Sequence, residues 1–241
     1  MAQYERQTVS SRVGTTAAID EGLRNHMLRV YNYMGLGLGI TGVIAFFVAR
    51  FAETSPAFAQ TIYGSPLAFV IMLSPLAFVF ALSFGINRMS AATAQMVFWG
   101  FAAVMGLSLS SIFLVYTDAS IAKVFFITAA MFGAMSLWGY TTKRDLTAMG
   151  SFLFMGLIGL IVASIVNIFL GSSMLEFAIS VLGVLIFTGL TAYDTQKIKE
   201  MYFEGDGAET AGKKAIMGAL ALYLDFINLF LMLLRLFGNR E

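Results

Sequence analysis

The stretch GALALYLDFINLFLMLL, residues 218–234, decides the fold, because it is an apolar run with a single carboxylate near its middle. Asp225 lies eleven residues after Lys214 and ten before Arg235, so at about 1.5 Å per residue it falls near the centre of a membrane-spanning helix. One stripe at 100° per residue collects the small and polar positions, namely Lys214, Gly218, Ala221, Asp225, Asn228 and Arg235. Such a stripe must face protein or water, which predicts a central helix.

Composition extends this reading to the whole chain. The 241 residues are 59% hydrophobic and 12% charged, whereas a soluble domain has about 45–50% apolar and 25% charged residues. Mean hydropathy is +0.81. The net charge of +1 argues against a nucleic-acid partner. The lack of cysteine and the single histidine, His26, exclude disulfides, thiol catalysis and histidine metal clusters. We therefore expect an all-α, polytopic membrane protein.

The apolar segments predict a bundle of seven transmembrane helices, each long enough to cross about 30 Å of hydrocarbon. Residues 1–27 are predicted to form an N-terminal cytoplasmic tail, with a short interfacial helix over 14–30 or no fixed structure. Residues 28–238 form the transmembrane domain, with a flexible cytoplasmic loop at 195–213. The expected spans are 31–49, 66–86, 92–116, 121–141, 147–170, 175–194 and 214–236.

Cation positions predict the orientation. With the N-terminus in the cytoplasm, eleven Lys and Arg residues lie on the cytoplasmic side and four on the far side, which accounts for all fifteen. The positive-inside rule then favours a cytoplasmic N-terminus and a C-terminus outside.

We interpret the glycine motifs within the spans as sites of close helix packing. Gly37, Gly39 and Gly42 match a dinucleotide fingerprint only formally, and we expect them, like GLSLSS at 106–111, to bring helices close together.

Ionisable groups at membrane depth are the candidate functional residues, since burying such a charge costs about 2.5–3.5 kcal/mol. Asp225 is the deepest, and Asp194 ends the sixth predicted span, where it could also be a solvated end paired with Lys197 or Lys199. Two carboxyl groups on neighbouring helices would titrate as one coupled unit. A shared proton would hold the helices together, and its loss would force them apart unless a cation intervened. Hard cations such as Ca²⁺ prefer oxygen ligands of this kind.

Several stretches resemble the Bax inhibitor-1 (transmembrane Bax inhibitor motif) family. They are TAYDTQKIKEMY (191–202), ALALYLDFINLFLMLLRLFG (219–238), FGINRMSAATAQMVFWGFAAVMGLSLSSI (84–112) and LRVYNYMGLGLGITG (28–42). The resemblance implies a seven-helix bundle with the last helix central and a pH-sensitive calcium leak gated by a di-aspartyl pair. It makes Asp194 and Asp225 the pH sensor and gate and a transient Ca²⁺ site, with Arg88 as their partner. The insertion GDGAETAG (205–212) departs from compact bacterial relatives.

The sequence therefore predicts a calcium or cation leak channel rather than an enzyme, with no cofactor and no catalytic residue. Asn228 and Arg235 are secondary pore-lining candidates. Expected partners are calcium ions, protons, the lipid bilayer and a membrane-protein partner, and the expected location is the bacterial cytoplasmic (inner) membrane. One alternative is an interaction protein that regulates a membrane protease or stress response. A minor alternative is an intramembrane aspartyl protease, which also uses two membrane aspartates, although Asp225 lacks a preceding Gly-x-Gly.

Overall fold

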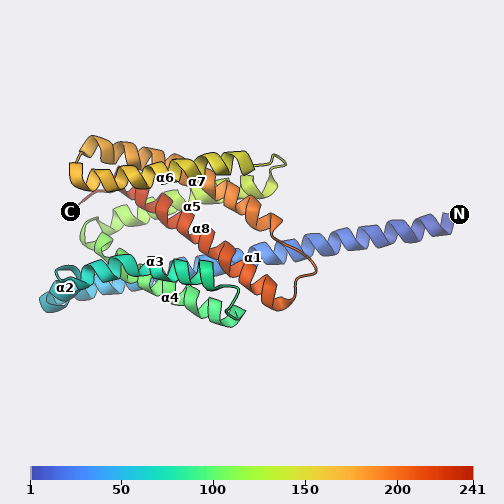
Figure 1. The fold of residues 1–241 in the computed structure, drawn as a ribbon, viewed down its shortest axis with the longest axis horizontal. Helices are drawn as coiled ribbons and strands as arrows, with labels where there is room; N and C mark the ends of the chain where they lie inside the picture. The colour runs from blue at the N-terminus through green and yellow to red at the C-terminus, as the bar shows by residue number, and fades with distance from the viewer. Residues whose placement is uncertain (1, 241) are drawn as a thin grey trace.

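The computed structural model describes the backbone of residues 2–240 and the side chains of residues 21–240. Helices run back and forth along one direction and form two layers around an oblique central helix (Figure 1). In chain order the elements are α1 (Ala2–Thr54), α2 (Pro56–Tyr63), α3 (Leu67–Gly85), α4 (Ala91–Leu109), the 3₁₀ helix η1 (Ser110–Leu114), α5 (Asp118–Thr141), α6 (Thr147–Leu170), α7 (Ser173–Glu200) and α8 (Ala208–Phe237).

Seven of these helical segments are long and apolar enough to cross a membrane, which confirms an all-α polytopic membrane protein. They cover residues 21–54, 67–85, 91–114, 118–141, 147–170, 173–200 and 208–237. Each matches one expected span, and the largest differences are at the ends of the first, sixth and seventh. Among the described residues, β-type backbone pairing is limited to one isolated antiparallel bridge between Tyr116 and Arg240.

The last helix is the centre of the bundle, as the polar stripe predicts. In the most apolar stretch of α8, 72% of the residues are buried, against 6% for α6. α8 packs against α1, α4, α5 and α7, whereas α6 has α7 as its one substantial helix neighbour among the described residues. A hydroxyl junction ties α8 to its neighbours, because Tyr223 bonds Thr41 over 2.6 Å and Thr41 donates to the carbonyl of Ala102 over 2.8 Å. Three helices therefore meet at one buried polar point.

Capping residues set the helix boundaries. Ser90, Thr117 and Ser172 each accept a hydrogen bond from a backbone N–H in the first turn of the following helix, which satisfies donors that no helix bond can reach. The Thr117 cap separates the third and fourth spans, the least distinct break in the sequence. α6 ends at Gly171, whose φ of 59° is the left-handed conformation that glycine adopts without a steric penalty. The chain turns back at once into α7.

Three segments differ from expectation. The loop predicted at 195–213 is shorter, since α7 continues to Glu200, α8 begins at Ala208, and only residues 201–207 lie outside helices. The short helix α2 was not predicted, because eight residues of mixed polarity carry no clear periodic signal. The predicted interfacial helix at 14–30 lies partly outside the described side chains, and from Glu21 onward the chain belongs to the first span.

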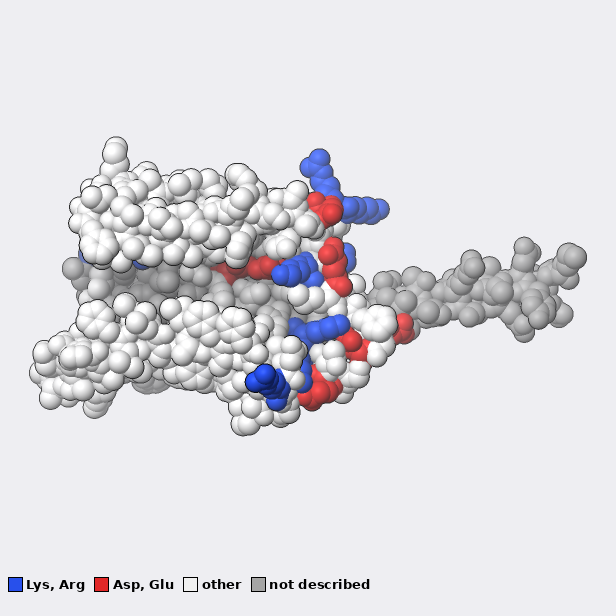
Figure 2. Space-filling view, in the orientation of Figure 1, with Lys and Arg blue, Asp and Glu red and all other residues white. Residues whose placement is uncertain are grey.

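Charged side chains gather at one end of the bundle, where α1 enters and α7 turns into α8 (Figure 2). Nine of the fifteen cations lie at this end, as the helix boundaries require. They are Arg24, Arg29, Arg88, Lys143, Arg144, Lys197, Lys199, Lys213 and Lys214. Two more that were assigned to this side, Arg6 and Arg12, lie outside the described side chains. The cytoplasmic assignment of this end remains a prediction.

Candidate functional site

The structure brings Asp194 on α7 and Asp225 on α8 together. Both side chains line one cavity, and the two carboxyl groups lie close enough to interact directly. Asp225 is 5% exposed, and its Oδ2 atom is buried without a hydrogen-bond partner among the described residues. A carboxylate can only accept, so a bond between two carboxyl groups requires a proton on one of them. A hydrogen bond between these two side chains would therefore place one proton between α7 and α8.

Helix geometry explains how two residues from different expected depths can meet. Asp194 lies six residues before the end of α7, whereas Asp225 lies seventeen residues into α8. α8 crosses the bundle at a slant (Figure 1), so its middle reaches the level of the α7 end. Gly218 supports the close approach, since an added Cβ there would lie 3.1 Å from the side chain of Ile198 on α7.

The two carboxyl groups line a cavity of about 890 Å³ between α6, α7 and α8. We call it the aspartate cavity and define it by its polar lining residues, Ser151, Ser164, Asp194, Lys197, Asp225 and Asn228. In Figure 2 acidic side chains are visible at the bottom of the cleft between the two layers. The Asn228 amide donates to the Leu224 carbonyl, which leaves its oxygen for the cavity. Oxygen atoms from three side chains of α7 and α8 thus face one space.

A second cavity of about 310 Å³ continues toward the opposite end of the bundle and shares Ser164 and Ile168 with the first. Its lining includes Glu176, Arg235 and Arg240. Arg240 and Glu176 form an ion pair at 3.6 Å. A hydrogen bond to Tyr116, with the charge of Glu176, raises the pKa of Arg240, so this guanidinium stays charged. Polar groups therefore continue from the aspartate cavity to the far end.

Arg88 does not join the aspartates. It lies exposed in the α3–α4 connection, and its side chain forms no ion pair within 4.0 Å among residues 21–240. The cation that lines the cavity is Lys197, one turn of α7 after Asp194. Lys199 instead bonds the carbonyl of Tyr140.

A chain of hydroxyl groups beside Asp194 was missed by sequence reasoning. Thr195 bonds Ser136 over 3.0 Å, and Ser136 bonds Tyr31 over 2.5 Å. These bonds link α7 to α5 and α1 at the residue that follows Asp194. Single hydroxyl residues are common in membrane spans, so the sequence had no signal that would separate these three from others.

The glycine interpretation is correct at some positions and wrong at others. A Cβ on Gly106 would lie 2.7 Å from the Thr41 carbonyl oxygen, and one on Gly37 would lie 3.1 Å from Phe98, so both glycines permit close helix contacts. Gly39 and Gly42 were expected to do the same, but an added Cβ there meets nothing within 4 Å. They face an open space because α1 and α5 lie apart along this stretch.

No group of three or more acidic, histidine or cysteine residues that could hold a metal occurs within the described part of the chain. The aspartate pair with Asn228 would therefore offer a cation only a few oxygen ligands, fewer than the six to eight of a tight calcium site. The geometry suits brief contact with a passing cation rather than storage of a bound metal.

Comparisons with known proteins agree with this architecture. The family model described as "Inhibitor of apoptosis-promoting Bax1" matches residues 23–241. An uncharacterised protein of Rickettsia prowazekii is 52% identical over 241 residues, covering all of both chains. The inner membrane protein YbhL of Escherichia coli is 50% identical over 223 residues, which are 91% of this chain and 94% of YbhL. An uncharacterised membrane protein of Streptococcus pyogenes is 37% identical over 227 residues, 92% of this chain and 96% of its own.

Proposed function

This chain belongs to the Bax inhibitor-1 family, and from that premise we propose that it is a pH-sensitive leak pathway for Ca²⁺ and other cations. The pathway runs through the aspartate cavity, and Asp194 and Asp225 control it. The observation that carries the proposal is the direct contact of these two carboxyl groups at the wall of a membrane-depth cavity. By analogy with YbhL, an inner membrane protein, its location is the bacterial inner membrane.

Proton occupancy sets the separation of α7 and α8 in this mechanism. With one shared proton, a hydrogen bond holds the two carboxyl groups together. Without it, two negative charges about 4 Å apart repel by about 4 kcal/mol at an effective dielectric constant near 20. That energy is comparable to the few kcal/mol that separate two conformations of a bistable element. A change in pH therefore shifts the balance between a closed and an open arrangement of these helices.

A divalent cation can take the place of the proton. Ca²⁺ prefers carboxylate and amide oxygens, and Asp194, Asp225 and Asn228 supply these from one side of the cavity. Binding must be weak enough for release if ions are to pass, and the small number of ligands meets that condition. Lys197 at the entrance opposes cation entry while Asp194 is protonated, so proton and cation compete for the same place.

The route beyond Asn228 leads to the second cavity. Met232 lines the aspartate cavity and is 8% exposed, and it lies one turn of α8 before Arg235, which lines the second cavity. A hydrophobic constriction between two polar spaces can stop ions by excluding water. We propose that the aspartate pair controls helix separation and that the Met232 region is the narrowest point of the closed state.

Calcium-loaded proteoliposomes with an external dye test the proposal. Wild type should show flux that varies with pH, and Asp225→Asn should remove that variation, because an amide can neither lose the proton nor carry the charge. Asp145→Asn is the matched control. Asp145 lies exposed in the α5–α6 connection. Hydrogen bonds from the Thr147 hydroxyl and backbone N–H lower the pKa of Asp145, so this carboxyl group stays ionised over the pH range of the assay. A pH profile unchanged in Asp225→Asn would refute the gate.

The same variants separate the leak from its rivals. If both Asp→Asn changes abolish cleavage of a model transmembrane substrate and reconstituted wild type shows no flux, the protein is an intramembrane protease rather than a channel. If partners that co-purify from membranes are lost on deletion of residues 1–25 and reconstituted protein shows no flux, a regulatory interaction is the function. We propose a transport role, not an enzymatic one.

A further inference from the structure

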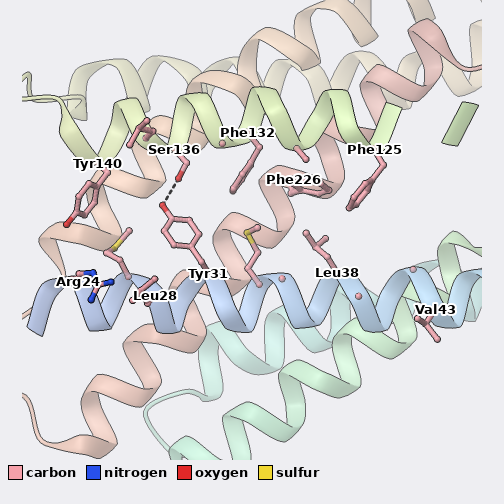
Figure 3. Close-up of a pocket in the computed structure, with 18 residues that line it drawn as sticks. Arg24, Leu28, Tyr31, Leu38, Val43, Phe125, Phe132, Ser136, Tyr140 and Phe226 are labelled. Carbon is pink, nitrogen blue, oxygen red and sulfur yellow. Dashed lines mark hydrogen bonds between the residues drawn. The ribbon is translucent and has the colours of Figure 1, made fainter. Parts of the chain in front are cut away.

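A groove separates α1 from α5 on the side of α8 that faces away from the aspartate cavity. The two helices have no substantial direct contact among the described residues. The groove has a volume of about 1040 Å³ and continues into a second space of about 380 Å³ that shares Leu38, Gly42, Phe125 and Phe226 with it. Figure 3 shows side chains from α1 and α5 facing each other across it. We call it the α1–α5 groove.

Its walls are apolar and open to the membrane. Leu28 on α1 and Leu137 on α5 form exposed edges, with 43% and 64% of their surfaces accessible. Gly35, Gly39 and Gly42 face the open space, where an added Cβ meets nothing within 4 Å. Both helices cross the bilayer, so the medium at these edges is lipid hydrocarbon rather than water. Hydrocarbon chains are the material that fills such a groove.

One end of the groove is polar and positively charged. Arg24 on α1 and Tyr140 on α5 lie on opposite walls of this end (Figure 3). Within residues 21–240, neither the Arg24 guanidinium nor the Tyr140 hydroxyl has a hydrogen-bond partner, whereas the ammonium group of Lys199 lies 5.2 Å from the Tyr140 ring. A guanidinium and a hydroxyl donor beside a second cation suit a phosphate group.

A hydrogen bond across the groove separates a lipid from a helix as the occupant. From Arg24 to Val43 the groove follows α1 for about 28 Å. The Tyr31 hydroxyl on α1 bonds Ser136 on α5 over 2.5 Å (Figure 3). This bond limits how deeply a helix about 10 Å in diameter can insert between α1 and α5. An acyl chain is thinner and can lie in the space that remains.

We propose that the α1–α5 groove binds an acidic phospholipid, with its phosphate between Arg24 and Tyr140 and an acyl chain that runs along α1 as far as Gly35. One leaflet is about 15 Å deep, which is ten residues of α1. A lipid whose phosphate lies at Arg24 therefore ends level with Gly35. The groove lies across α8 from the aspartate cavity, so lipid binding does not depend on the proposed leak.

Native mass spectrometry of the full-length protein tests this, with phosphatidylglycerol and phosphatidylcholine of identical chains added in equal amounts. Wild type should retain more phosphatidylglycerol. Arg24→Gln should lower its retention roughly fivefold, as expected for one cation near an anionic surface, and leave phosphatidylcholine unchanged. Arg24→Lys should keep most of the preference. Arg29→Gln is the matched control, because Arg29 is exposed at the same end of α1 but does not line the groove.

A second pair of variants tests the acyl chain. Gly35→Leu fills the groove and should lower retention of both lipids, whereas Gly159→Leu, on exposed α6 with equal free space, should lower neither. Asp225→Asn should retain phosphatidylglycerol like wild type.

Three results would overturn the proposal. One is equal retention of the two lipids by wild type, and another is the same loss in Arg24→Gln and Arg29→Gln. The third is a Gly35→Leu protein that changes from dimer to monomer with unaltered lipid retention, which would assign the groove to a second copy. If Gly35→Leu fails to fold, the arginine variants still decide the question.

Discussion

The aspartate cavity and the α1–α5 groove are similar in volume and opposite in chemistry. Both border α8, and adjacent residues of that helix line them, Asp225 on one side and Phe226 on the other. The aspartate cavity contains two carboxyl groups and an amide, whereas rings of Phe125, Phe132 and Phe226 lie along the groove. α8 therefore divides the bundle into a side that suits ions and a side that suits hydrocarbon.

The largest expected effect comes from placing a carboxylate on the wrong side. Phe226→Asp removes a ring that lies 5.5 Å from the rings of both Phe125 and Phe132, a loss of about 3–5 kcal/mol. It also adds a membrane charge at about 3 kcal/mol. We expect little folded protein on size-exclusion chromatography, whereas Phe226→Leu should remain folded. A well-folded Phe226→Asp protein would show that the two sides are interchangeable.

The next effect concerns coupling within the aspartate cavity. Asp194→Asn and Asp225→Asn should each flatten the dependence of calcium flux on pH, and the double variant should be no flatter than either one, because both act on one shared proton. Flux measured between pH 5 and pH 8 gives the comparison. Additive effects of the two changes would mean that the carboxyl groups titrate independently.

A smaller effect is expected at the constriction. Met232→Ala shortens the side chain between the aspartate cavity and the second cavity, so basal flux should rise severalfold while its pH midpoint stays in place. Met155→Ala is the control, since Met155 on α6 is 64% exposed toward the membrane. A moved midpoint would indicate that Met232 acts on the aspartate pair rather than on the width of the route.

The smallest effect lies at the floor of the groove. Tyr31→Phe removes the bond to Ser136 and should cost about 0.6 kcal/mol, a loss of about 1–3 °C in Tm for a chain of this size. Thermal unfolding in detergent measures it. Tyr33→Phe, which removes a longer bond of 3.4 Å to Gln95, should change Tm less. Equal changes in Tm for the two variants would show that the Tyr31 hydrogen bond stabilises the fold no more than the longer Tyr33 bond does.

Sequence reasoning located the spans and the aspartate pair because both depend on chemistry that is visible locally. Hydropathy alone did not separate a central helix from a peripheral one, since the values for α8 and α6 are 2.0 and 2.5. The polar stripe around Asp225 did, because lipid excludes such a stripe. The pairing of Asp194 with Asp225 was implied by the family resemblance, since the residues alone left Asp194 open to a solvated helix end.

Other features depend on how helices are placed and leave no local signal. Arg88 was assigned to the aspartates by resemblance, yet the structure leaves it exposed and has Lys197 at the cavity. The α1–α5 groove exists because two helices stay apart, and periodicity gives no information on helix separation. For the same reason Gly39 was expected at a helix contact and instead lines the groove.

The central position of α8 has a consequence for biosynthesis. The ribosome makes this helix after the other six spans, so those spans enter the membrane without the helix on which α1, α4, α5 and α7 pack. Until it arrives, the Thr41 hydroxyl has no Tyr223 to bond, and Asp194 has no second carboxyl group. Chains released before residue 208 would therefore lack the helix that fills their interior. The thirty residues of α8 decide whether a nascent chain can complete its packing.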